Sequence, residues 1–382
     1  MKYNGDYLAN QITNYRFSQI LFIMKHVSLS YLPNVFLTIA VTFACTHEKK
    51  IGINESNQLS STIGRSPNRT VIAFGSCSKQ YNPNQRWADI LENDPDIWIW
   101  LGDNIYGDTH DMNFMAEKYA HQKADTGYQL LLKSVSNIIG TWDDHDYGIN
   151  DGGRFYSKKK ESKELFIDFL DIPEDNPIRD HEGVYQSYDY NFGEHLLKII
   201  LLDTRYFRDT IERNFVTRAY IPNQEGDVLG EEQWLWLDNE LNESLADLIL
   251  IGSSIQVIPE EQIYEKWANL PKARKRLFDL LEKYPEKRII FLSGDRHIAE
   301  ISEMSLDGLD YPLYDFTSSG LTHTWLRDDI EQNKYRISDF IIHLNFGLIL
   351  IDWAEDKNHK ITFQIKGEGN SLLYEFMPEL YP

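Results

Sequence analysis

Residues 97–106 read IWIWLGDNIY, and this stretch decides what kind of fold the chain adopts. A short, continuous apolar run such as residues 97–101 predicts a strand that is buried on both faces of a sheet. The run ends in Gly102 and Asp103, so polar residues follow the strand directly. Comparable runs, each ending in glycine or polar residues, predict further strands at 70–75, 196–203, 248–252, 288–293, 346–352 and 360–366.

Helical patterns separate several of these expected strands, at 163–170, 231–241 and 272–284. Strands that alternate with helices predict an α/β or α+β chain built on a mixed sheet. Residues 70–382 contain no internal repeat and no second linker, so we expect them to form one domain.

The composition excludes two classes of protein. The chain has 38 Lys and Arg residues against 59 Asp and Glu, for a net charge of -21. A nucleic-acid scaffold needs a basic face, so this role is excluded. Only two cysteines are present, which excludes a disulfide framework. The same acidity would repel a phosphate ester unless cations in the site reverse the local field.

The N-terminal residues 1–45 have the pattern of a targeting segment. Residues 27–45 (VSLSYLPNVFLTIAVTFAC) carry no charge, follow Lys25 and precede the polar THEKK. We therefore expect an exported, extracytoplasmic protein, held to the membrane as a bacterial lipoprotein through Cys45, with Met24 as an alternative start. An ordinarily cleaved signal, an uncleaved membrane anchor and a buried core helix are the alternatives. Residues 46–69 then form a flexible tether, and residues 70–382 form the folded domain.

Potential metal ligands and acid–base groups gather in four loops, each just after an apolar run. The loops are FGSC (74–77), LGDNIY (101–106), WDDHD (142–146) and SGDRH (293–297). Each alone has a structural explanation, such as a buried cysteine, a turn aspartate, a solvated acidic turn or a surface ion pair. Together, their carboxylates would repel severely unless metal cations neutralised them. A dinuclear metal site is the simplest interpretation.

Seven sequence strings in order resemble the PhoD-like (alkaline phosphatase D) family of calcineurin-like metallophosphoesterases. The resemblance covers about 70–370 and implies two facing mixed β-sheets flanked by helices, with a metal site at one end. The strings are FGSC (74–77), WADIL (87–91), WLGDNIYGD (100–108), TWDDHDYGIND (141–151), LLDTRYFR (201–208), LSGDRH (292–297) and YDFTSSGLTH (314–323).

The resemblance also implies a set of metal ligands. One metal would be held by Cys77, Asp103, Tyr106 and His297, and Asp103 would bridge to a second metal. The second metal would also bind Asp144 and Asp295, with a weaker match at Gln256.

Ligand chemistry favours different metals at the two positions. A thiolate and a phenolate favour a transition metal, here ferric iron, whereas the oxygen ligands suit Ca²⁺, Mg²⁺ or Mn²⁺. The family suggests Fe³⁺ with Ca²⁺ in a dinuclear or trinuclear site, and Mn²⁺, Mg²⁺ and Zn²⁺ are the alternatives.

The expected reaction is hydrolysis of phosphate monoesters, or of diesters, by a metal-activated hydroxide. We expect His145 to protonate the leaving group or to hydrogen-bond the phosphate. A structural ion pair of Arg205 with Asp203 or Asp209 is an equal alternative, and His323 is expected to be structural. The remaining candidates for contact with the phosphate are Asn104, Asn150, Arg205 and Arg296.

A rival hypothesis from another class is a non-catalytic surface lipoprotein that binds glycans or another ligand through Trp and Tyr side chains. Every candidate ligand position still carries a side chain able to bind metal, which favours catalysis.

Overall fold

The structure is a computed structural model that describes residues 68–83, 85–325 and 330–381. The expected targeting segment (1–45), Cys45 and the tether up to residue 67 lie outside this range. Within it, no helix is long and apolar enough to cross a membrane. The first strand begins at Arg69, at the end of the stretch expected to be a tether.

Two six-stranded sheets form the centre of the fold, and both mix parallel with antiparallel pairs. The first sheet has the order β14 (Leu372–Phe376), β13 (Lys360–Lys366), β12 (Phe346–Asp352), β1 (Arg69–Gly75), β2 (Ile97–Leu101), β3 (Asn137–Thr141). The second has the order β10 (Ala299–Met304), β11 (Leu313–Ser318), β9 (Ile289–Ser293), β8 (Leu248–Ser253), β5 (His195–Leu201), β4 (Gln186–Phe192). A separate hairpin pairs β6 (Glu212–Arg213) with β7 (Tyr220–Ile221).

The alternation of side chains along β1 and β2 places a core on each face of the first sheet. Phe74 belongs to the core between the two sheets and packs edge-to-face on Phe316 of β11, with ring centroids 4.8 Å apart. Trp98 and Trp100 of β2 point the other way and pack with Trp87. The IWIWL run is therefore buried on both faces, as the sequence predicts.

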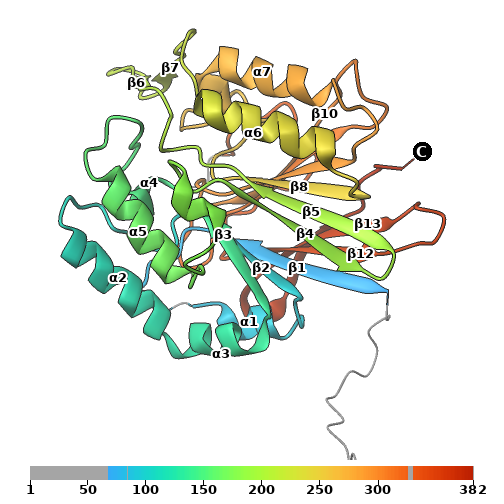
Figure 1. Ribbon diagram of the computed structural model, residues 1–382, viewed down its shortest axis with the longest axis horizontal. Helices are drawn as coiled ribbons and strands as arrows, with labels where there is room; N and C mark the ends of the chain where they lie inside the picture. The colour runs from blue at the N-terminus through green and yellow to red at the C-terminus, as the bar shows by residue number, and fades with distance from the viewer. Residues whose placement is uncertain (1–67, 84, 326–329, 382) are drawn as a thin grey trace, which may run out of the picture. The chain divides into compact units, whose positions relative to one another are not determined.

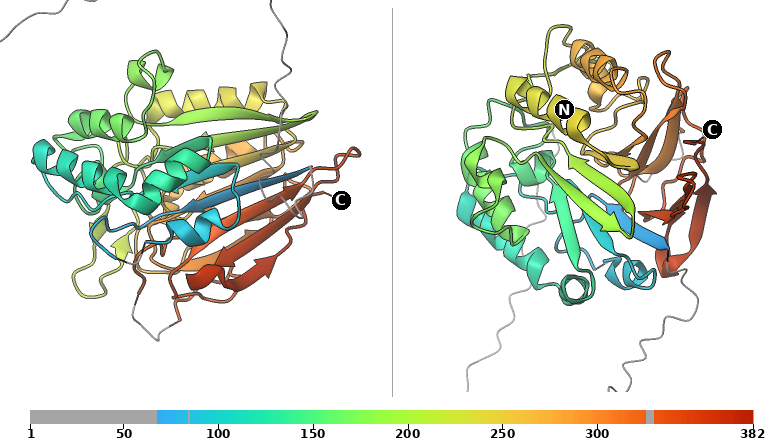
Figure 2. Two further views of the ribbon diagram at one scale, coloured as in Figure 1. Left: turned by 90° about the horizontal axis from the view of Figure 1, so that it is seen from below. Right: turned by 45° about the vertical axis from the view of Figure 1, so that its right-hand side comes forward.

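Helices cover the outer faces of the sheets (Figures 1 and 2). Beside the first sheet lie α1 (Trp87–Leu91), α2 (Met112–Ala124), α3 (Thr126–Ser134) and α5 (Lys159–Phe169), and beside the second lie α6 (Gly230–Glu243) and α7 (Pro271–Leu281). A single short turn forms α4 (Asp144–Tyr147), and 3₁₀ turns occur at Pro177–Asp180, Trp267–Asn269 and Glu368–Asn370. The expected fold class, two facing mixed sheets flanked by helices, is confirmed.

Sequence periodicity does not predict α2, and the composition of this helix explains why. Only Met115, Tyr119 and Gln122 are buried along its 13 residues, so the apolar stripe is too thin to give a clear helical pattern. Asp111 caps this helix by accepting hydrogen bonds from the backbone N–H groups of Asn113 and Phe114.

The loops that follow β2 and β9 meet where the two sheets come together. A Cβ atom on Gly294 would lie 2.5 Å from the carbonyl oxygen of Leu101 and 2.6 Å from Ser76 Oγ. Only glycine permits so close an approach, so this position brings a loop of the second sheet against loops of the first.

The core between the sheets should carry most of the stability. Leu250 in β8 is fully buried, so Leu250→Ala should lower the free energy of unfolding by about 2–5 kcal/mol in urea titrations. The control Leu245→Ala removes the same atoms from a side chain that is 83% exposed, and should change it by less than about 0.5 kcal/mol. Equal effects of the two substitutions would contradict this assignment of the core.

Candidate metal centre

The structure brings together the six side chains expected to bind metal. Ligand atoms of Cys77, Asp103 and His297 all lie within 4.8 Å of one another. The Tyr106 hydroxyl oxygen is 2.9 Å from His297 Nε2 and 3.2 Å from Asp103 Oδ2. These four residues thus converge on one position, as the resemblance implies.

Two further clusters of potential ligands adjoin this first set. Asp103, Asp144 and His145 have ligand atoms within 4.8 Å of one another, and so do Asp143, Asp144 and Asp295. Asp103 is shared between the first set and its neighbour, so it lies where a bridging ligand would have to be.

Four of these candidate ligands have backbone conformations that side chains other than glycine seldom adopt. The φ angles are 62° at Cys77, 51° at Asp103, 64° at Asp295 and 54° at His297. A residue held in this left-handed region costs on the order of 1–3 kcal/mol and persists where the surroundings impose it. Such strain is common at functional sites. Eleven non-glycine residues of the described chain have a positive φ, and four of them are candidate ligands.

The carboxylate of Asp146 fixes the relation between two of these loops, a role that the sequence reading missed. Its Oδ1 accepts hydrogen bonds from the backbone N–H groups of Asp103 (3.2 Å) and Asp143 (2.7 Å). Its Oδ2 accepts from the backbone N–H (3.2 Å) and the side-chain amide (2.7 Å) of Asn104. The only sign of this role in the sequence is the third aspartate of the DDHD string. A sequence does not show the direction in which that side chain points.

Burial and mutual repulsion dominate the electrostatics of the site. Burial raises the pKa of Asp103 well above its usual range, and the carboxylates of Asp144 and Asp143 add to the effect. The pKa of Asp295 is raised well above its usual range for the same two reasons. Among the described residues, Arg205 is the guanidinium that pairs with Asp143, through Nη2 at 2.5 Å. Negative charge therefore exceeds positive charge in this part of the chain.

The buried oxygen atoms around the site fit metal cations. Asn104 Oδ1, Asp143 Oδ2 and Asp144 Oδ1 are buried and accept no hydrogen bond from any described residue. A buried carboxylate oxygen without a donor is costly, and a bound cation removes the cost. Donor types also fit, since thiol, phenol and imidazole groups gather on one side and carboxylates on the other.

His145 is held by Asp108, a residue that the sequence reading did not single out. His145 Nδ1 lies 2.7 Å from Asp108 Oδ1, which leaves Nε2 available to a ligand. Burial disfavours the charged imidazole, but the carboxylates of Asp103 and Asp144 outweigh it and, with Asp108, raise the pKa to about 11. These acidic neighbours therefore favour the protonated form of His145.

His323, expected to be structural, contacts the candidate metal centre. Its Nε2 lies 3.0 Å from the Tyr106 hydroxyl, and its ring centroid is 4.3 Å from that of His297. Burial lowers the pKa of His323 to about 3, so the ring is neutral. The SSGLTH string had pointed to this residue without showing which group it would contact.

Three expectations for polar side chains need correction. Gln256 is buried, and its amide nitrogen donates to Glu300 Oε1 (2.8 Å) and Thr317 Oγ1 (2.9 Å). Its Oε1, the atom that would bind a metal, accepts from Gln262 Nε2 at 3.3 Å, so both ends of the amide are occupied within the core. Arg205 is fully buried between Asp143 and Glu265, which makes it a structural cation that a substrate cannot reach.

The acidic partners of Arg205 also differ from the expected Asp203 and Asp209. The carboxylate of Asp203 instead accepts the backbone N–H of Arg205 at 2.8 Å. Arg296, the third correction, is buried and pairs with Glu331 at 2.5 Å, while its guanidinium lies 4.2 Å from the ring centroid of Tyr264.

The two asparagines expected to contact phosphate lie in different environments. Asn104 is buried, and its amide nitrogen donates to Thr141 O (3.1 Å) and Asp146 Oδ2 (2.7 Å), so it cannot also donate to a phosphate. Asn150 is exposed in the loop after α4, and its contact with substrate stays a prediction.

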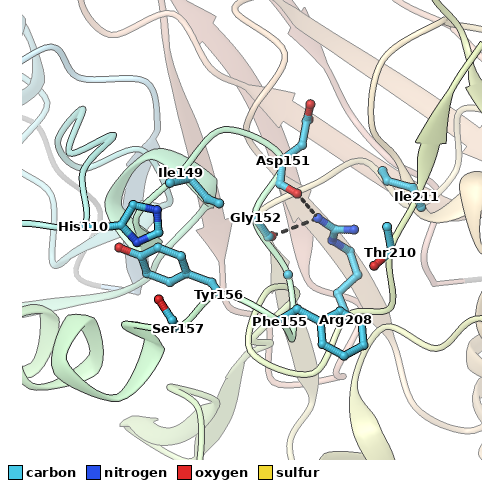
Figure 3. A pocket seen from close by; sticks show the side chains of 11 residues that line it. His110, Ile149, Asp151, Gly152, Phe155, Tyr156, Ser157, Arg208, Thr210 and Ile211 are labelled. Carbon is cyan, nitrogen blue, oxygen red and sulfur yellow. Dashed lines mark hydrogen bonds between the residues drawn. The ribbon is translucent and has the colours of Figure 1, made fainter.

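The loop after α4 hydrogen-bonds Asp144 and lines a small cavity of about 240 Å³ (Figure 3). The backbone N–H of Asp151 donates to Asp144 Oδ2 at 2.6 Å. Arg208 donates through Nη2 to the carbonyl oxygens of Asp151 (2.5 Å) and Gly152 (2.9 Å), as the dashed lines show. Glu265 pairs with both Arg205 and Arg208, so one ion-pair network holds this loop beside the candidate ligands.

A larger groove, of about 740 Å³, opens onto the metal centre. Its lining includes the candidate ligands Tyr106 and His297, together with His145. The rest of the lining consists of Lys79, Gln80, Tyr81, Asn82, Pro83, Asp108 and Lys118.

Residues 116–339 match the family model of the PhoD-like phosphatases. The chain belongs to the PhoD-like phosphatase family. Its family thus indicates a phosphoesterase with a metal site, and its ligand clusters agree with that class. Three candidate ligands, Cys77, Asp103 and Tyr106, precede the matched region, so their assignment depends on the geometry described above. Among curated proteins, none matches this chain in sequence.

Two solved structures share the fold of this PhoD-like protein. One is the structure of PhoD, with 16% identity, a TM-score of 0.66 and coverage of 82% of this chain and 70% of that chain. The other is GAP50, the anchor in the inner membrane complex of Plasmodium, with 11% identity, a TM-score of 0.53 and coverage of 82% and 90%. At these identities the likeness establishes the fold alone.

The buried carboxylates make the stability of the metal-free protein depend on pH. Burial raises the pKa of Asp143 to about 7 and that of Asp146 to about 8, so the folded chain retains protons that the unfolded chain releases. His145, with its pKa raised from 6.5 to about 11, acts in the same direction above pH 6.5. His297, with its pKa lowered by burial, acts in the opposite direction only below pH 6.5.

The melting temperature of the metal-free protein should therefore fall between pH 6.5 and 8, by at least about 2 °C. Scanning calorimetry in chelator would measure it. Metal-loaded protein is the control and should show a smaller fall, because bound cations stabilise the ionised carboxylates. Equal slopes with and without metal would contradict this account.

Proposed function

We propose that this PhoD-like protein is an exported, lipid-anchored phosphoesterase that hydrolyses phosphomonoesters in preference to diesters. The observation that carries the proposal is the convergence of Cys77, Asp103, Tyr106 and His297 next to Asp144 and Asp295. The uncharged segment that ends at Cys45 supports export and anchoring.

The proposed metals are Fe³⁺ at the position of Cys77, Tyr106 and His297, and Ca²⁺ at the position of Asp144 and Asp295, with Asp103 between them. Bound there, the cations would polarise the phosphoryl oxygens and supply a nucleophile from water at neutral pH. The P–O bond to the leaving group breaks in this reaction, and a new P–O bond forms to an oxygen from water.

His145 is the residue proposed to deliver the proton that the leaving oxygen needs. His145 lines the groove, and its Nδ1 is bound to Asp108, so Nε2 is the nitrogen that can donate a proton to the leaving oxygen. Bound cations would offset the carboxylates of Asp103 and Asp144, which leaves Asp108 as the lasting support for a protonated ring.

The direct test combines metal content with hydrolysis. Purified protein should contain about one iron and one or more calcium ions per chain by mass spectrometry. It should hydrolyse p-nitrophenyl phosphate faster than the bis(p-nitrophenyl) ester, and chelator should abolish both activities. A diester preference of about tenfold or more would reverse the proposed substrate order.

Asp103→Ala should lose metal and activity while its circular dichroism spectrum remains that of a folded protein, because the substitution removes a buried charge. Asp307→Ala, at an exposed carboxylate, is the control and should retain both. Wild-type protein without metal or turnover, even after reconstitution, would support the rival hypothesis of a non-catalytic ligand-binding lipoprotein. An active, metal-replete Asp103→Ala protein would refute the site assignment.

Asp108 should act as a positioning residue for His145. Asp108→Asn should lower kcat by about 10- to 100-fold with little change in KM, because the neutral amide supports the imidazolium less well. The loss should be larger for phenyl phosphate than for p-nitrophenyl phosphate, whose leaving group departs without a proton. Asp307→Asn serves as the matched control, and equal losses on the two substrates would exclude a role in proton delivery.

A further inference from the structure

The groove beside the metal centre has room for far more than the phosphoryl group that would react there. Its volume of about 740 Å³ falls in the range of small-molecule sites, about 300–1,000 Å³. Tyr106, His145 and His297 form one wall, and the segment 79–83 contributes half of the lining residues. This space is therefore where the leaving group of a phosphate ester would lie.

Lys79 differs from the other cations that line the groove. Lys118 donates through Nζ to the carbonyl oxygens of Tyr106 (2.7 Å) and Gly107 (2.8 Å), and His145 is bound to Asp108. The Lys79 side chain is exposed and forms no ion pair or hydrogen bond with the described residues. Its Nζ lies 5.0 Å from the ring centroid of Tyr106, so the ammonium group is held close to the candidate metal ligands.

The backbone around Lys79 is fixed even though the ammonium group is uncommitted. The Lys79 N–H donates to Thr322 Oγ1 at 2.8 Å. Its carbonyl oxygen accepts from Asn82 N (2.9 Å) and Gln85 Nε2 (3.2 Å). The base of the side chain is therefore positioned, and only the flexible stem moves the charge within the groove.

In a chain of net charge -21, an uncommitted ammonium group in a groove is a local attraction for anions. A lysine binds phosphate or carboxylate as a point charge, and so tolerates several ligand geometries. We propose that Lys79 binds a second anionic group, carried by the leaving group, and thereby sets substrate specificity. The substrate class is then phosphate esters whose leaving group bears a further phosphate or carboxylate, a proposal that rests on the proposed function.

The test compares three substrates that differ only in the leaving group: phenyl phosphate, 3-carboxyphenyl phosphate and benzene-1,3-diyl bisphosphate. Lys79→Met, which keeps an apolar stem, should lower kcat/KM about tenfold or more for the two substrates whose leaving group is anionic. It should change kcat/KM for phenyl phosphate less than twofold. The larger of the two losses identifies the preferred anion, phosphate or carboxylate.

Two variants serve as controls: Lys79→Arg should retain most of the selectivity, and Lys133→Met, at an exposed lysine outside the groove, should match wild type. Equal losses on the substrates with and without an anionic leaving group, or no loss, would overturn the proposal.

Binding without turnover separates this proposal from the proposed function. Phenylphosphonate and 3-carboxyphenylphosphonate cannot be hydrolysed, and calorimetry gives the Kd of each for metal-loaded wild type and for Lys79→Met. Only the carboxylated analogue should bind the variant about tenfold more weakly. If wild type binds both analogues equally well, Lys79 has no such role even in an active enzyme. An inactive wild type that still prefers the carboxylated analogue would refute hydrolysis but leave the anion site standing.

Discussion

Buried negative charge is the constraint on which the rest of this structure depends. Asp103, Asp143, Asp144 and Asp146 are buried, and the half-buried Asp295 lies close to them. Burial makes each isolated charge costly. The fold meets this cost in two ways: backbone N–H groups of Asp103, Asn104 and Asp143 donate to Asp146, and Arg205 pairs with Asp143. Cations would neutralise what these arrangements leave uncompensated.

Sequence periodicity predicted much of the architecture because the central strands are fully buried. IWIWL, LILIG and IIFLS have no polar face, and they became β2, β8 and β9. α2 was not predicted, because its packing depends on three spaced side chains rather than on a wide apolar stripe. The loops after these strands come together in the structure, since parallel strands place their carboxyl ends at one edge of a sheet. Metal binding by these loops stays a prediction.

Side-chain direction was what the sequence could not supply. Residue type identified Asp144 as a candidate ligand, but it did not show that Asp146, two positions later, turns toward the loop after β2. The same limit applies to cations: Arg205 and Arg296 had the right charge for phosphate, yet acidic partners distant in sequence, Glu265 and Glu331, hold them in the interior. Only a three-dimensional contact distinguishes a lysine such as Lys79 from these arginines.

The candidate ligands come from loops of both sheets: Cys77 and Asp103 follow strands of the first sheet, and Asp295 and His297 follow β9 of the second. A cation held by both sets would cross-link the halves of the sandwich. Bound metal would therefore slow any opening of the core that parts the two sheet ends, while the groove keeps the site itself accessible. Resistance to proteases would then depend on the rate of that opening and not on equilibrium stability alone.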